Sequence, residues 1–123
     1  MQVFTLVFLG GGLGSICRYA ITVWMQPWQL RFPWATLAAN GLACFVLGAL
    51  LGWQLSGQMP DRYRLLLATG FCGGFSTFST FTAETWQLWQ TGQTTAAMIN
   101  VAVSLAVCMV CLLLGLVFEA VVF

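Results

Sequence analysis

The chain has 123 residues, of which 60% are hydrophobic and only 6% are charged, and its formal net charge is +1. A water-soluble domain of this size cannot bury so much apolar surface, so the composition excludes a soluble globular protein. The near-neutral charge gives no reason to expect nucleic acid as a partner. Because a membrane-spanning helix needs about 20 mostly apolar residues, the length predicts about four spans in a lipid bilayer and no separate soluble domain.

Hydropathy and turn-forming residues predict spans at about residues 3–24, 33–54, 63–89 and 95–120, so that residues 1–123 form one all-α transmembrane domain. Each of the short loops between them contains Pro or Gly. The Trp residues lie near the predicted span ends, as amphipathic rings do at the headgroup level. Glycines four residues apart predict close helix packing, and these pairs are Gly10 and Gly14, Gly48 and Gly52, and Gly70 and Gly74.

The arginines give almost no preference for one orientation across the membrane. Arg62 and Arg64 lie on the side of the chain ends, where Asp61 partly offsets them. Arg31, together with Arg18 near the end of the first span, lies on the other side. Since Lys and Arg in short loops set the orientation, a chain with so little bias is expected to insert both ways. Two opposed copies would pair as an antiparallel homodimer, with the symmetry that inverted repeats give to many transporters.

Polar side chains inside predicted spans are costly and are therefore candidates for function. Asn40 and Thr36 lie one turn apart on the second span. Asn100 and Ser104 repeat this spacing on the fourth span. A membrane Asn either hydrogen-bonds to a neighbouring helix or offers its amide to a ligand, and the sequence leaves both readings open. The ionisable side chains in the spans are Arg18, Glu84 and Glu119.

The stretch GFCGGFSTFSTF at residues 70–81 places glycines and hydroxyl groups inside the third predicted span. Phe78 and Phe81 are three residues apart and share one face of a helix. The preceding glycines weaken a helix by roughly 1 kcal/mol each, so we expect the third helix to be broken here. The break is either a glycine kink with Ser and Thr bonded to the preceding turn, or irregular backbone that is buried or lines a wet cavity.

The acidic residues help to separate the classes of membrane protein. A small proton-coupled exporter of drugs or cations, which is the main alternative, would carry a carboxylate deep in a span. The acids before the last span are Asp61, in a loop, and Glu84, late in the third span. A purely structural membrane protein would not need the hydroxyl cluster at residues 76–82. An enzyme is not expected, because the chain has no nucleophile–base pair and no metal-ligand constellation. Neutral donors with one arginine suit an anion instead.

Three motifs resemble the small CrcB-type (Fluc) fluoride channels of microbes, and the resemblance covers the whole chain. The motifs are GGGLGSICRY in the first span, FPWATLAANGLACFVLG in the second and GFCGGFSTFSTF in the third. The resemblance implies a passive, fluoride-selective channel that exports fluoride and lowers its intracellular concentration. It also implies an antiparallel, dual-topology homodimer with two pores, in the plasma membrane of a microbe or the inner membrane of a Gram-negative cell.

The resemblance further implies roles for individual residues. Those expected to line the fluoride pore are Asn40, Phe78, Phe81, Ser79, Thr80 and Thr36. Those expected at its vestibule are Arg18 and Glu84. The backbone carbonyls of Gly73 and Ser76 would hold a structural Na⁺ at the dimer centre. Trp34 and Ala35 stand where the family usually has Pro-Gly or Gly, so the second helix is expected to start with a different tilt.

These residue types suit fluoride for a physical reason. The ion is small and strongly hydrated, so a selective path must replace its water with good donors. Side-chain amides and hydroxyls do this without a fixed positive charge that would trap the ion. The edge of a phenyl ring is positive, so Phe78 and Phe81 can solvate an anion if they are turned edge-on. Conduction also requires several sites in series that the ion can leave again.

Overall fold

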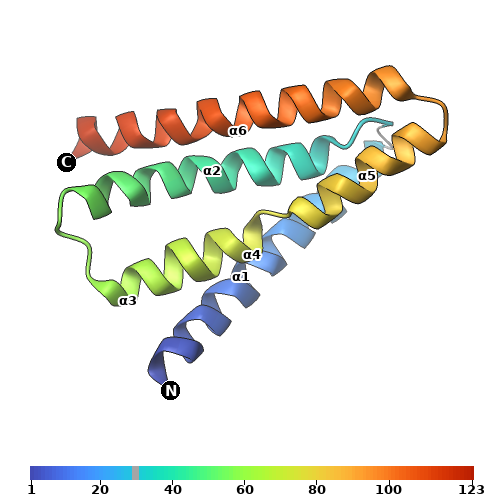
Figure 1. The fold of residues 1–123 in the computed structure, drawn as a ribbon. Coiled ribbons are helices and arrows are strands. Elements are labelled where there is room, and N and C mark those ends of the chain that lie inside the picture. The colour runs from blue at the N-terminus through green and yellow to red at the C-terminus, as the bar shows by residue number, and fades with distance from the viewer. Residues whose placement is uncertain (29–30) are drawn as a thin grey trace.

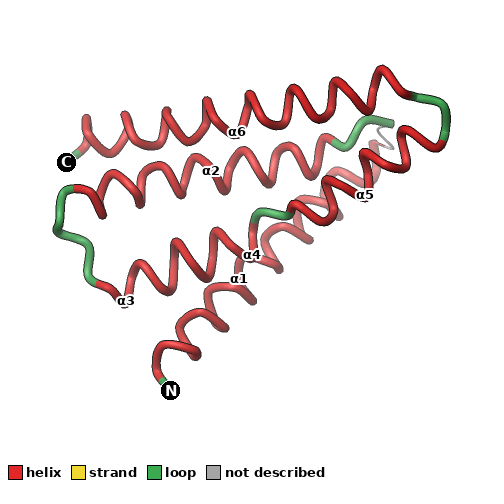
Figure 2. Tube along the Cα trace, viewed as in Figure 1, coloured by secondary structure: helices red, strands yellow, loops and turns green. Residues whose placement is uncertain are grey.

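The computed structural model describes residues 1–28 and 31–123, and Figures 1 and 2 show its fold. Helices make up nearly all of these two ranges, and no strand occurs within them. The all-α class predicted from the sequence is therefore confirmed. The helices in the described part that are long and apolar enough to cross a membrane are Gln2–Trp28, Trp34–Leu55 and Thr94–Val122.

The long helices begin and end close to the boundaries predicted from hydropathy. They are α1 (Gln2–Met25) with its short 3₁₀ extension η1 (Gln26–Trp28), α2 (Trp34–Leu55) and α6 (Thr94–Val122). Pro33 directly precedes α2, where its missing N–H costs nothing because the first turn of a helix leaves that donor unpaired. Gly57 and Gly92 have φ values of 73° and 78° in the loops after α2 and α5, a conformation that favours glycine.

The chain between α2 and α6 forms several shorter pieces. They are α3 (Asp61–Tyr63), η2 (Arg64–Cys72), α4 (Gly73–Phe75) and α5 (Phe78–Gln90). The first three pieces follow one another without a gap, and η2 has the wider π-helical form. Ser76 and Thr77 are extended and separate α4 from α5 (Figure 2). Because of this interruption, no single helix in residues 61–90 reaches the length of a membrane span.

The helices pack through a few main contacts. α2 and α6 lie side by side and antiparallel (Figure 1), and they share the largest contact in the structure. α1 packs mainly against η2 and α4, while α5 packs against α6. Both chain ends and residues 56–60 lie toward one end of the bundle, and residues 91–93 lie at the other (Figure 1).

Glycines allow the closest of these helix contacts. A Cβ atom at Gly48 of α2 would collide with the α6 backbone at Leu112. A Cβ atom at Gly10 or Gly14 of α1 would collide with the backbone of η2. Small residues that let backbones approach are how membrane helices gain packing energy where lipid gives no hydrophobic drive. The close packing predicted from the glycine pairs is confirmed at these positions.

Gly48→Ala is expected to destabilise the protein by about 1–3 kcal/mol, because even a methyl group must push α2 and α6 apart. At an open helical position the same change is favourable, since Ala is the better helix former. A Cβ atom at Gly12 of α1 would meet no described atom within 4 Å, so Gly12→Ala is the matched control. Reversible unfolding in mixed detergent micelles measures both variants. A Gly48→Ala protein as stable as the parent would contradict the close contact.

A small cluster of buried apolar residues lies where α2 meets α4. It consists of Ala39, Ala43 and Phe75, with Ile21 and Phe71 packed against it. Many large apolar side chains along α1 and α6 are exposed instead. An apolar surface of this extent needs lipid or another protein surface to cover it. The fold therefore supports a multi-pass membrane protein.

Candidate functional site

The centre of the candidate site is the interruption between α4 and α5. Ser76 has a ψ of 154°, and Thr77 has φ and ψ values of −149° and 112°, so both are extended. The Ser76 hydroxyl donates to the Cys72 carbonyl oxygen at 2.8 Å, and its backbone N–H donates to the same atom at 3.0 Å. The break thus combines the two features that the sequence left as alternatives: a hydroxyl bonded to the preceding turn and irregular backbone.

Thr77 restarts the helix after the break. Its hydroxyl oxygen accepts a hydrogen bond from the backbone N–H of Thr80 at 3.2 Å, which is the usual N-cap arrangement. The Thr77 and Thr80 hydroxyl groups are also bonded, at 3.0 Å, and the Ser79 hydroxyl lies 3.3 Å from that of Thr77. Ser79 and Thr80, both predicted as pore lining, therefore belong to the cap of α5.

Asn40 of α2 is bound to the broken backbone. Its Oδ1 accepts from the Thr77 N–H at 2.7 Å, and its Nδ2 donates to the Thr77 carbonyl at 3.2 Å. The side chain thus replaces both hydrogen bonds that Thr77 would have made in a continuous helix, as a buried backbone requires. One Nδ2 hydrogen remains for another acceptor, because an amide carries two donors. Asn40 therefore acts as a bond between helices and keeps a donor available.

A groove beside the break brings several predicted residues together. It has a volume of about 280 Å³ and is lined by Asn40, Cys44, Ser76, Thr77, Phe78, Phe81, Ser104, Leu105 and Cys108. The rings of Phe78 and Phe81 have centroids 5.5 Å apart and are tilted by 43°. Phe78 is 76% exposed, so the groove is open on one side of this chain. Asn40, Phe78 and Phe81 thus share one space with Ser104 of α6.

Ser104 is one of the groove residues that the sequence did not assign to the site. Its hydroxyl donates to Asn100 Oδ1 at 3.3 Å, and Asn100 Nδ2 donates to the Thr85 hydroxyl at 2.9 Å. Asn100 is only 1% exposed, so it bonds α6 to α5 and reaches no open space. The spacing of Asn100 and Ser104 in the sequence marked both as candidates. Only the packing shows that Asn100 is buried and bonds two helices together, whereas Ser104 lines the groove.

Thr36 and Glu84 form a separate polar pair outside the groove. The Thr36 hydroxyl donates to Glu84 Oε1 at 2.9 Å. The other carboxylate oxygen, Oε2, is buried and has no hydrogen-bond partner among the described residues. Glu84 also lines two clefts of about 460 and 330 Å³, and Arg31 lines the smaller of them. The structure thus places Thr36 beside the predicted vestibule residue and not in the groove.

Arg18 and the two predicted carbonyl ligands lie around α4. The Arg18 Nε–H donates to the Gly74 carbonyl at 3.2 Å, and the Ser15 hydroxyl approaches the same oxygen at 3.4 Å. Arg18 therefore satisfies a carbonyl at the end of the interrupted helix and does not line the groove. Within residues 1–28 and 31–123, no hydrogen bond reaches the carbonyl oxygens of Gly73 or Ser76. Both oxygens are free to accept another ligand.

The sequence as a whole matches a known family. The family model described as "CrcB-like protein, Camphor Resistance (CrcB)" matches residues 5–116. The chain belongs to the CrcB-like family. This confirms the resemblance inferred from the three motifs.

Several relatives of this CrcB-like chain carry the name "Fluoride-specific ion channel FluC". One from Enterobacter sp. (strain 638) is 39% identical over 106 residues, covering 85% of this chain and 84% of the relative. Relatives from Erythrobacter litoralis and Thermus thermophilus are each 44% identical, over 78 and 75 residues. Those two matches cover 58% and 60% of this chain and span only 57% and 59% of the relatives' own lengths.

Proposed function

We propose that this CrcB-like chain is a passive, fluoride-selective channel that exports fluoride and so lowers its concentration in the cell. The observation that carries the proposal is the groove, which the Asn40 amide, the Ser104 hydroxyl and the Phe78 and Phe81 rings line together. The relatives named as fluoride-specific ion channels support the same ion. On this proposal the chain is a channel and not an enzyme, since the passage of fluoride needs no covalent step.

The groove can replace the water around fluoride with neutral donors. The second Asn40 Nδ2 hydrogen supplies one, whereas the single hydrogen of the Ser104 hydroxyl is already donated to Asn100 Oδ1. The tilted phenyl rings do not stack face to face, so that their positive edges can turn to the ion. None of the described side chains that line the groove carries a charge. An anion therefore meets several moderate sites in series and no strong trap, which is what conduction requires.

We infer that the segment from α3 to α5 is the third of four membrane spans, broken at Ser76 and Thr77, and that two copies pair in opposite orientations. The balanced arginines support the dual topology. The exposed Phe78 ring supports the pairing, because a groove that is open in one chain would be closed by a second. The dimer would then contain two pores in the plasma membrane of a microbe, which is the inner membrane in a Gram-negative cell.

The free carbonyl oxygens of Gly73 and Ser76 fit a structural Na⁺ at the centre of this dimer. Oxygen ligands suit hard cations, and no hydrogen bond among the described residues occupies either carbonyl oxygen. Two oxygens do not complete the coordination of a cation, and an opposed copy would supply an equal pair. The ion would supply a fixed positive charge that holds the two breaks together.

Replacing Na⁺ by N-methyl-D-glucamine throughout purification is expected to weaken the dimer, because the bulky cation cannot enter a site made of backbone carbonyls. Crosslinking and size-exclusion chromatography of the detergent-solubilised protein measure the dimer fraction. Restoring Na⁺ should restore the dimer. An unchanged dimer fraction without Na⁺ would remove the ion from the assembly.

Growth of bacteria that lack their own fluoride exporters tests the function in cells. Expression of the chain is expected to restore growth in fluoride-containing medium and to lower intracellular fluoride. The empty vector and a Phe81→Ile variant are the controls. Uptake of a drug driven by a proton gradient, without any effect on fluoride, would favour a proton-coupled exporter instead.

A further inference from the structure

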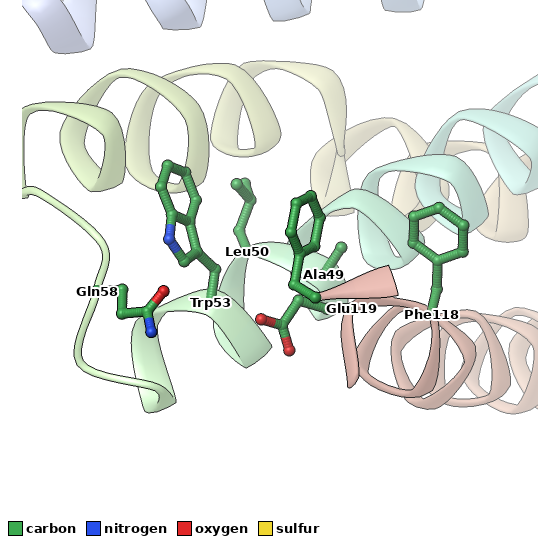
Figure 3. Close-up of a pocket in the computed structure, with 7 residues that line it drawn as sticks. Ala49, Leu50, Trp53, Gln58, Phe118 and Glu119 are labelled. Carbon is green, nitrogen blue, oxygen red and sulfur yellow. The ribbon is translucent and has the colours of Figure 1, made fainter. Parts of the chain in front are cut away.

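Another cleft lies at the end of the bundle that holds the chain termini, and Figure 3 shows the side chains that line it. It has a volume of about 560 Å³, which is within the usual range for small-molecule sites. The side chains that define it come from the end of α2, the following loop and the end of α6. They are Leu50, Trp53, Gln58, Phe118 and Glu119.

The carboxylate of Glu119, on α6, lies against Gly52 of α2, in space that is free because glycine has no side chain. A Cβ atom at Gly52 would lie 2.7 Å from Glu119 Oε2 and 3.1 Å from Glu119 Cβ. Any larger residue would therefore expel the carboxylate from its position. Figure 3 shows Glu119 near Trp53 and Gln58, with the apolar side chains of Leu50 and Phe118 on either side.

The charge of Glu119 is not compensated within the described part of the chain. The ion pair found there joins Arg64 to Asp61 at 3.3 Å, and no hydrogen bond to the Glu119 carboxylate occurs in residues 1–28 and 31–123. Glu119 also lies in the last turn of α6, where the helix dipole opposes a negative charge. An external cation at this position would relieve both costs.

We propose that the cleft binds the headgroup of a phospholipid that carries a primary ammonium group. The ammonium would donate to Glu119 and lie against the Trp53 ring, where cation–π attraction adds to the ion pair. The first part of an acyl chain would cover Leu50 and Phe118. The Trp53 and Tyr63 rings have centroids 5.8 Å apart, and Arg62 lies 5.0 Å from the centre of the Tyr63 ring. This arrangement puts a positive charge at the same end of the bundle for the lipid phosphate.

Native mass spectrometry of the purified, delipidated protein tests the proposal. Phosphatidylethanolamine is titrated in parallel with phosphatidylcholine and phosphatidylglycerol of the same acyl chains. We expect phosphatidylethanolamine to bind about tenfold more tightly than the other two, because only its headgroup both carries a positive charge and donates hydrogen bonds. Glu119→Gln should lower this affinity about tenfold, while Asp61→Asn, which removes a carboxylate at the same end but outside the cleft, should not.

Three results would overturn the proposal. One is equal binding of phosphatidylethanolamine to the parent protein and to the Glu119→Gln variant. Another is equal or tighter binding of phosphatidylglycerol. The third is binding of a single-chain amine such as dodecylamine without binding of the phospholipid, which would assign the cleft to soluble amines. The readout is lipid binding and not ion flux, so its failure and a failure of the fluoride proposal are distinguishable.

Discussion

Replacing Phe81 by isoleucine is expected to slow fluoride flux at least about a hundredfold while leaving the folded protein intact. Isoleucine keeps most of the apolar volume but removes the positive ring edge. Fluoride would then pass this point without a group that replaces its water. This raises the free-energy barrier to permeation by about 3 kcal/mol. Flux from liposomes, measured with a fluoride electrode, reads the effect directly.

Phe45→Ile is the matched control for this change. Phe45 is a partly buried ring that forms a tilted pair with Phe118 at 5.7 Å, and it does not line the groove. We expect this variant to conduct fluoride at close to the parent rate. Parent-like flux in Phe81→Ile would show that the ring edge has no part in permeation, whatever Phe45→Ile does.

Asn40→Asp is expected to block fluoride by placing a negative charge at the groove. At an effective dielectric constant near 20, two like charges about 4 Å apart repel by about 4 kcal/mol, which corresponds to a rate reduction of about a thousandfold. The carboxylate also cannot donate to the Thr77 carbonyl, which accepts from Asn40 Nδ2 at 3.2 Å in the parent protein. Reconstituted flux and the elution profile of the purified variant separate loss of conduction from loss of folding.

The Asn40→Ala variant separates the effect of the added charge in Asn40→Asp from the effect of the lost hydrogen bonds. It removes both bonds to Thr77 without adding a charge, and leaving those backbone groups unpaired costs about 1–3 kcal/mol each. We therefore expect Asn40→Ala to be less stable than the parent but less completely blocked than Asn40→Asp. Full conduction by the aspartate variant would place Asn40 outside the ion path.

The helical part of the fold could be predicted because its signals are local. Hydropathy placed the second span at residues 33–54, and the helix runs from Trp34 to Leu55. Glycine spacing indicated where helices approach closely, as at Gly48. The π-helical form of Arg64–Cys72, which packs against α1, has no comparable local signal in the sequence.

The partners of the polar residues could not be predicted, because they lie far apart in the sequence. Asn40 pairs with Thr77 across 37 residues, and Thr36 pairs with Glu84 across 48. The sequence suggested that Asn40, Phe78 and Phe81 act together, and the structure brings them to one groove. It did not show that Ser79 and Thr80 belong to a helix cap. The sequence alone does not distinguish a hydroxyl group that lines a pore from one that bonds to a helix end, because this depends on the backbone conformation around it.

Fluoride efflux from liposomes that contain the purified protein tests the central claim most directly. The liposomes are loaded with fluoride and chloride, and two ion-selective electrodes follow the release of each ion. The account predicts fast loss of fluoride with chloride retained, and no loss of either ion from protein-free liposomes. Equal release of both ions, or retention of both, would contradict a fluoride-selective channel.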